Sequence, residues 1–209
     1  MAKLLYIEAS PRKDRSHSIR VARTFLDAYL AAHQRDAVET LDLWDTVLPP
    51  FNGDTIAAKY AVIHGESFTS AQASAWDGVK AVFNRFNNAD KYLFSVPMWN
   101  FGVPYVFKHY IDVITQPGLA WSWSPDQGYK GLLSGKRAAL ACSSGGAYHP
   151  GSGAEAMDFQ KPYLETWLRF IGIADIQTIA IAPTIADTDT VDAAKQKALM
   201  DASEIARKF

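Results

Sequence analysis

The sequence contains little cysteine: among its 209 residues, only position 142 is a cysteine. A single thiol excludes an internal disulfide and any metal site built from several cysteines. We interpret Cys142, at the end of an expected strand, as a small buried apolar residue rather than a nucleophile. The histidines show neither HExxH nor any other clear metal-binding spacing, so no metal site is expected. They are His17, His33, His64, His109 and His149.

The sequence also lacks an excess of charge of either sign and any long hydrophobic run. Its formal net charge is -1, which gives no bulk electrostatic attraction for nucleic acid or an anionic membrane. No stretch approaches the length that spans a bilayer, and the first ten residues, MAKLLYIEAS, show no cleavage site of a signal peptide. We therefore expect a cytoplasmic protein whose partners are small molecules rather than nucleic acid or membrane.

Aromatic residues are abundant, with 6 Trp, 9 Tyr and 11 Phe. This content suggests either an aromatic-lined pocket or simply an aromatic core.

The hydrophobic periodicity predicts strands alternating with helices along the whole chain. The expected strands are 3–8, 38–43, 91–96, 137–142 and 176–182, and the expected helices are 18–33, 71–87, 104–115, 158–171 and 191–209. Between them, 44–70 reads as irregular or partly helical, and 118–134 reads as a hairpin with its turn at Pro125, Asp126 and Gly128. Without repeats or linkers, residues 1–209 are expected to form one α/β domain, doubly wound around a mostly parallel sheet.

The connection after the first strand, 8–20 (EASPRKDRSHSIR), combines hydroxyls, positive charge and a helix amino terminus. Ser10, Ser16 and Ser18 supply the hydroxyls, while Arg12, Lys13 and Arg15 supply the charge. Exposed N–H groups and the helix dipole favour an anion such as phosphate at this place. The alternative is an ordinary capping loop in which Ser16 or Ser18 is the N-cap.

The connection after the third strand, within 95–112 (SVPMWNFGVPYVFKHYID), offers apolar, aromatic and amide groups. Met98 and Trp99 give apolar and π surface, Asn100 can donate and accept hydrogen bonds, and Gly102 allows close approach to the backbone. These groups suit the polar edge of a flavin. The alternative is a helix-entry turn in which Asn100 is the cap.

The connection after the fourth strand, 143–153 (SSGGAYHPGSG), has adjacent glycines that leave backbone N–H groups uncovered. Tyr148 and His149 can close over a ligand there. If the sheet has the order 2-1-3-4-5, the three connections converge on one crevice at the point where the strand order reverses. Two weaker motifs are discounted: 151–156 (GSGAEA) does not directly follow a strand, and 131–137 (GLLSGKR) lacks the spacing of a P-loop.

With these residues assembled, the chain resembles the FMN-dependent NADH-azoreductases, a bacterial branch of the flavodoxin-like NAD(P)H:quinone oxidoreductases. The matching motifs lie in order along the chain, and a further match is 162–172 (PYLETWLRFIG). The resemblance implies a three-layer flavodoxin-like fold with helices on both faces of a five-stranded parallel sheet. It also implies an FMN site formed by these residues: Ser10, Ser16, His17, Ser18, Pro97, Met98, Trp99, Asn100, Phe101, Ser143, Ser144, Gly145 and Gly146.

The resemblance further implies a homodimer in which aromatic residues of the partner chain help to form the substrate pocket. Trp121, Trp123 and Phe170 correspond to these pocket residues, and Tyr148 is a fourth candidate. The expected activity is ping-pong transfer of hydride from NADH through tightly bound FMN to quinones or azo compounds. No catalytic side chain is expected beyond an electrostatic role for Asn100, because the chemistry belongs to the cofactor.

Two other readings remain open. One is a flavodoxin-like one-electron carrier, although such carriers usually have an acidic surface and a short, Thr-rich phosphate loop. The other is a flavin-free domain whose aromatic loops bind a protein.

Overall fold

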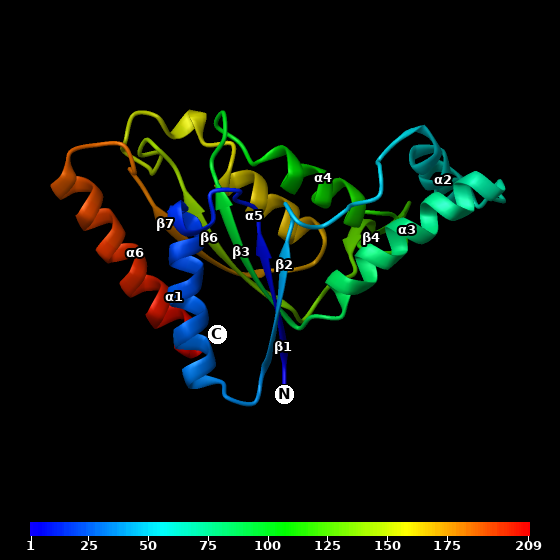
Figure 1. The fold of residues 1–209 in the computed structure, drawn as a ribbon. Coiled ribbons are helices and arrows are strands. Elements are labelled where there is room, and N and C mark those ends of the chain that lie inside the picture. Colours follow the sequence, from blue (N-terminus) through cyan, green and yellow to red (C-terminus); the bar gives the residue numbers. More distant parts are fainter.

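The computed structural model describes residues 1–209 and contains a five-stranded parallel sheet (Figure 1). Its strands are β1 (Lys3–Glu8), β2 (Ala37–Asp42), β3 (Lys91–Pro97), β6 (Arg137–Ser143) and β7 (Asp175–Ile181). They lie in the order β2-β1-β3-β6-β7, and every neighbouring pair is parallel. Counted along the chain, this is the order 2-1-3-4-5, so the predicted fold class is confirmed.

Helices cover both faces of this sheet and make a three-layer structure. One face packs against α1 (His17–Ala32) and α6 (Thr188–Lys208), and the other against α3 (Ser70–Asn87), α4 (Tyr105–Ile114) and α5 (Lys161–Phe170). Successive residues of a strand point to opposite faces. In β1, Leu4 and Tyr6 therefore join the first cluster, while Leu5 and Ile7 join the second. Burial on both faces explains why the central strands read as continuous apolar runs.

The segment between β2 and α3 contains a helix that the sequence pattern only partly indicates. This helix, α2 (Gly53–His64), begins after Asn52, whose side-chain oxygen accepts a hydrogen bond from the N–H of Thr55 at 3.2 Å. It ends at Gly65, whose φ of 69° lies in the left-handed region that favours glycine. Its buried residues are Thr55, Ala58 and Ala61, which are too small to give an apolar stripe in the sequence. None of the helices is both long enough and apolar enough to cross a membrane.

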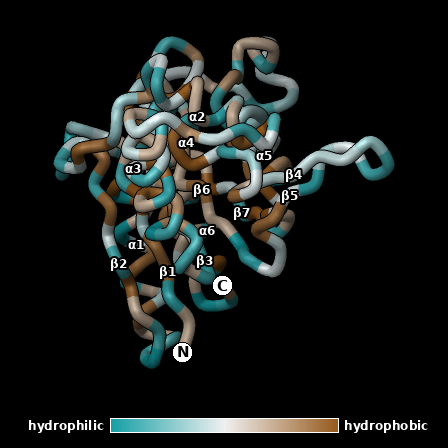
Figure 2. The backbone as a smooth tube through the Cα atoms, turned by 90° about the vertical axis from the view of Figure 1, so that its right-hand side faces the viewer, coloured by the Kyte–Doolittle hydropathy of each residue, from teal (hydrophilic) through white to brown (hydrophobic).

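The predicted hairpin is confirmed as β4 (Trp121–Ser124) and β5 (Gly128–Gly131), which pair antiparallel. Figure 2 shows it reaching away from the sheet, with hydrophilic residues at its tip. At its base, the N–H of Leu133 donates to the carbonyl of Ile171 at 2.9 Å. The hairpin is thereby fixed to the end of α5.

Candidate functional site

A cleft of about 390 Å³ lies at the carboxyl edge of the sheet, between the loops that follow β1, β3, β6 and β7. Its lining residues are Ser10, Arg12, Ser16, His17, Pro97, Met98, Trp99, Ser143, Ser144, Gly145, Thr184 and Ile185. The strand order reverses between β1 and β3, which is where ligands bind in open α/β sheets. The structure thus brings together residues from all three loops that the sequence singled out.

The first turn of α1 supplies backbone donors to this cleft. Ser16 is the N-cap, and its hydroxyl oxygen accepts a hydrogen bond from the N–H of Ile19 at 3.4 Å. The N–H groups of His17 and Ser18 have no acceptor within the chain. Together with the positive end of the helix dipole, these free donors have the chemistry that favours an anion such as phosphate. The capping role of Ser16 is confirmed, and it leaves the N–H groups of His17 and Ser18 free.

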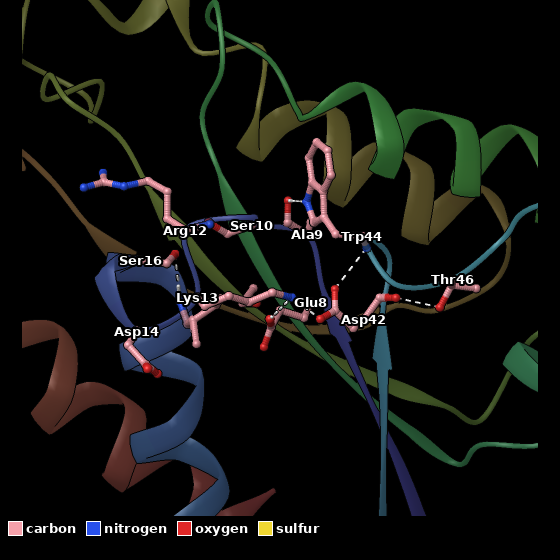
Figure 3. Close-up of polar contacts among 12 residues, drawn as sticks. Glu8, Ala9, Ser10, Arg12, Lys13, Asp14, Ser16, Asp42, Trp44 and Thr46 are labelled. Carbon is pink, nitrogen blue, oxygen red and sulfur yellow. Dashed lines mark hydrogen bonds and ion pairs between the residues drawn. The ribbon is translucent and has the colours of Figure 1, made fainter.

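The basic residues of the first loop do not all line the cleft, and Figure 3 shows the side chains of Arg12 and Lys13 pointing in different directions. Arg12 lines the cleft, but Lys13 turns inward and forms ion pairs with Glu8 and Asp42. Arg15 is exposed and does not line the cleft. Of the three basic residues of this loop, only Arg12 therefore lines the cleft, because carboxylates inside the fold hold Lys13.

The surroundings of His17, which lines the cleft, disfavour its imidazolium form. Partial burial lowers its pKa, and the nearby positive charges of Arg12, Arg20 and Lys195 lower it further. The same charges that disfavour the imidazolium favour a bound anion.

The second loop forms a tight two-residue turn. The N–H of Trp99 donates to the carbonyl of Gly102, and the N–H of Gly102 donates back to Trp99, each at 3.0 Å. The two central residues, Asn100 and Phe101, have φ values of 47° and 69°. Asn is suited to such a turn, whereas Phe is unusual there. The N-cap of α4 is Pro104, so the alternative that Asn100 caps this helix is wrong.

The third loop is bound to the loop after β7. The N–H of Thr184 donates to the carbonyl of Ser144 at 3.0 Å, and the N–H of Ile185 donates to Gly145 at 3.1 Å. The N–H groups of Gly145 and Gly146 remain without an acceptor in the chain. A side-chain carbon at Gly145 would lie 3.0 Å from the Ile185 side chain, so this glycine permits the close packing.

Thr184 and Ile185 line the cleft but were not predicted. They follow the fifth strand and therefore lie at the same edge of the sheet as the other loops. Their position after a strand is the signal that could have identified them.

Four of the residues predicted for the cofactor site do not line the cleft. Ser18 is buried below it, with its hydroxyl 3.1 Å from that of Ser16. Asn100 lines an adjacent groove of about 600 Å³, and Phe101 is 46% exposed at the turn. Gly146 lies beneath the ring of Tyr148, where an added side-chain carbon would be 3.3 Å from Cζ.

The aromatic residues predicted for the substrate pocket lie elsewhere. Trp121 and Phe170 line a separate pocket of about 500 Å³ formed by α4, α5 and the hairpin, while Trp123 lines a neighbouring one of about 380 Å³. Tyr129, which was not predicted, packs between Trp121 and Phe170 with ring centroids 5.4 and 5.7 Å away. Within one chain, none of these rings lines the cleft.

Neither a nucleophilic cysteine nor a metal centre is found in the structure. Cys142 is buried, and burial raises its pKa to about 12, which keeps it a protonated thiol. No group of three or more His, Cys, Asp or Glu side chains is arranged to hold a metal ion. The cleft itself combines free backbone N–H donors with an aromatic side chain, Trp99.

The chain is similar to several known proteins along its whole length. A family model described as a flavodoxin-like fold matches residues 2–206. The FMN-dependent NADH:quinone oxidoreductase of Desulfotalea psychrophila is 44% identical over 209 residues, which cover 100% of this chain and 98% of that protein. The crystal structure of an azoreductase from Bacillus anthracis superposes with a TM-score of 0.92 at 30% identity and full coverage of both chains. A second Bacillus anthracis structure, an FMN-dependent NADH-azoreductase in complex with FMN, gives a TM-score of 0.83 at 26% identity, covering 99% of this chain and 100% of the other.

Proposed function

Because the chain belongs to the flavodoxin-like family of FMN-dependent NADH:quinone oxidoreductases, we propose that it transfers electrons from NADH through FMN to quinones or azo compounds. FMN supplies the two-electron chemistry when bound, since it can accept a hydride and release both electrons to an acceptor. The protein supplies binding, orientation and electrostatics. The whole chain, 1–209, acts as one FMN-binding domain in this proposal.

The observation that carries the proposal is the combination of an anion site and an aromatic wall in one cleft. The free N–H groups of His17 and Ser18, with the side chains of Ser10, Ser16 and Arg12, have the donor chemistry that a phosphate requires. On the other side, Met98 and Trp99 offer an apolar surface suited to a planar ring. The hydrogen-bond donors therefore fit the phosphate of FMN, and the apolar surface fits its aromatic ring system. FMN is the tightly bound cofactor and NADH the donor.

The chain also offers groups that stabilise negative charge on a reduced ring. The N–H groups of Gly145, in the cleft, and of the adjoining Gly146 are free, and Asn100 lies beside the cleft in the adjacent groove that Trp99 also lines. Fixed donors of this kind act as an oxyanion hole does, because they require no reorganisation when the charge develops. Ser143, Ser144 and Pro97 complete the wall of the cleft. One face of the ring serves both substrates in turn, so we assign a ping-pong cycle.

We assign a homodimer to the working enzyme. The pocket lined by Trp121 and Phe170 lies outside the cleft of its own chain, yet it is aromatic and suited to a quinone or azo compound. The neighbouring Trp123 and Tyr129 are 58% and 66% exposed. In the proposed dimer, these rings of one protomer face the cleft of its partner. We also assign the enzyme to the cytoplasm, because its electron donor is NADH and its one cysteine forms no disulfide.

The one-electron carrier is the less favoured alternative. A carrier exchanges electrons with protein partners and commonly shows a strongly acidic surface, whereas this chain has a net charge of -1. Its aromatic pocket of about 500 Å³ also has the size of a small-molecule site.

Steady-state kinetics with NADH and a benzoquinone test the proposal. The purified, FMN-supplemented protein is assayed without partner proteins, with both substrates varied. Turnover with parallel double-reciprocal lines supports the ping-pong enzyme, whereas intersecting lines contradict the ping-pong order. An absence of turnover with flavin bound favours the carrier, and a protein that binds no flavin favours the flavin-free domain. Sedimentation of the same sample tests the homodimer, which a monomeric active species contradicts.

A further inference from the structure

Lys13 belongs to the loop between β1 and α1, but its side chain reaches toward Glu8 and Asp42 (Figure 3) and does not line the cleft. Its Nζ lies 3.0 Å from Oε1 of Glu8 and also pairs with the carboxylate of Asp42. The side chain of Glu8 is only 9% exposed and that of Asp42 22%. Lys13 thus joins the loop to the ends of two neighbouring strands, β1 and β2.

The backbone of Lys13 has an unusual conformation at the same place. Its φ of 48° lies in the left-handed region, which is unfavourable for a residue with a side chain. Such a conformation persists only where the surrounding structure holds it. The carbonyl of Lys13 accepts a hydrogen bond from the N–H of Ser16 at 2.9 Å. The position of Lys13 therefore determines where Ser16, the N-cap of α1, is placed.

The carboxylates that hold Lys13 are themselves fixed. The hydroxyl of Tyr6 donates to Oε2 of Glu8 at 3.2 Å and lies 3.0 Å from Oγ of Ser95. Asp42 accepts a hydrogen bond from the N–H of Trp44 at 3.0 Å, and the indole Nε1 of Trp44 donates to the carbonyl of Ala9 at 3.0 Å. The loop is consequently anchored to β1, to Ala9 directly after β1, and to the segment that follows β2.

The charge of Lys13 is retained in this environment. Partial burial acts to lower its pKa, but the hydrogen bonds to Asp42 and Glu8 outweigh burial and raise it. The same ion pair lowers the pKa of Asp42 against the opposing effect of burial. The contact is therefore a charged pair at neutral pH.

We propose that Lys13 is a positioning residue for the cofactor phosphate. It does not contact the phosphate; it fixes the loop so that Ser10, Ser16 and the first N–H groups of α1 converge on it. This inference rests on the proposed function, because it presupposes a phosphate in the cleft. It concerns the phosphate alone, so the flavin ring by itself binds independently of Lys13.

The test compares FMN with riboflavin, which has the same ring system but no phosphate. Dissociation constants are measured from flavin fluorescence for the wild type, Lys13→Met and Arg15→Met. The Lys13→Met variant is expected to bind FMN about tenfold more weakly, equivalent to losing one charge-assisted hydrogen bond, with riboflavin affinity unchanged. Arg15→Met removes the same charge from an exposed position of the same loop, and its FMN affinity is expected to change by about twofold or less because solvent screens it.

A double variant separates the effect of the loop's position from the effect of net charge, and it avoids leaving the buried Glu8 carboxylate unpaired. Glu8→Gln with Lys13→Met keeps the net charge constant, and it is expected to lose the preference for FMN as the single variant does. The single variant Lys13→Arg keeps the positive charge and is expected to retain most of the preference for FMN over riboflavin. Thermal unfolding of each protein without flavin shows whether it is folded, so a variant that fails to fold is replaced by the double variant.

The inference is overturned if Lys13→Met and Arg15→Met weaken FMN equally, since only charge then matters. It is also overturned if the folded double variant binds FMN like the wild type, or if FMN and riboflavin weaken in proportion. The wild type distinguishes a failure of the proposed function: if it binds no flavin, or binds riboflavin as tightly as FMN, there is no phosphate site for Lys13 to position.

Discussion

Replacement of Gly131 by alanine is expected to displace the β4–β5 hairpin from α5 and to damage the substrate pocket. A side-chain carbon at position 131 would lie 2.2 Å from the nitrogen of Gly172 and 2.4 Å from the carbonyl carbon of Ile171. Both are backbone atoms and cannot rotate away. Because ordinary contacts between heavy atoms begin near about 3.5 Å, the hairpin and the end of α5 must separate by roughly 1 Å.

The expected cost is at the upper end of that for overpacking, about 3 kcal/mol in the free energy of unfolding. For a chain of this length, about 3 kcal/mol corresponds to a fall of roughly 6–12 °C in Tm. Trp121 and Tyr129 lie on the hairpin while Phe170 lies on α5, so their contacts at 5.9 and 5.7 Å change with the separation. The KM for quinone is therefore expected to rise several-fold. FMN affinity is expected to stay the same, because the cleft has no residue from the hairpin.

Gly128→Ala is the matched control on the same hairpin. Gly128 has a φ of +65° and nothing within 4 Å of the added carbon, so alanine costs only about 1 kcal/mol of backbone strain. Differential scanning fluorimetry gives Tm, and steady-state kinetics gives KM for both variants. An equal loss of stability in the two variants, or an unchanged quinone KM in Gly131→Ala, would refute the reasoning.

Three further predictions concern other parts of the chain. Asn100→Gly keeps the positive φ of the turn but removes the amide, so turnover with quinone is expected to fall at least about tenfold; full turnover with full FMN affinity contradicts a role for Asn100. The hydroxyl of Tyr29, at 2.6 Å, and the N–H of Ala2 hold the pKa of Asp36 well below its usual range, a stabilisation present above the unfolded value and lost as the pH falls below about 4. Urea unfolding is thus expected to show a smaller loss of stability in acid for Asp36→Asn than for the wild type, and parallel losses in the two proteins contradict this. Because burial raises the pKa of Cys142 to about 12, iodoacetamide at mildly alkaline pH is expected to leave the native protein unmodified, and labelling without denaturant, seen by mass spectrometry, contradicts it.

The sequence pattern predicted the strands and the hairpin because each depends on local regularities, whereas the sheet order was expected from the family resemblance. Continuous apolar runs mark strands that are buried on both faces, and Pro125 with Gly128 marks a turn. The helix Gly53–His64 was only partly indicated, because it packs through small residues and follows two prolines. A helix of this kind is recognised from its packing against α3 rather than from its periodicity.

The candidate site was predictable where it depends on which loops leave the strand ends, and unpredictable where it depends on distant partners. Ser10, Ser16 and Trp99 reach one cleft because their loops share an edge of the sheet. The orientation of Lys13 could not be predicted, because its ion-pair partner Asp42 lies 29 residues away along the chain. The exclusion of Asn100 from the cleft follows similarly from the turn's backbone conformation, which residue types alone do not determine.

The most direct test of the central claim is an anaerobic titration of the FMN-supplemented protein with NADH, followed by addition of a benzoquinone. The visible absorbance of the flavin reports its redox state throughout. Stoichiometric bleaching by NADH and recovery of the absorbance with quinone are the predicted results. Bound flavin that stays oxidised, or a protein that binds no flavin, contradicts the assignment of the cleft.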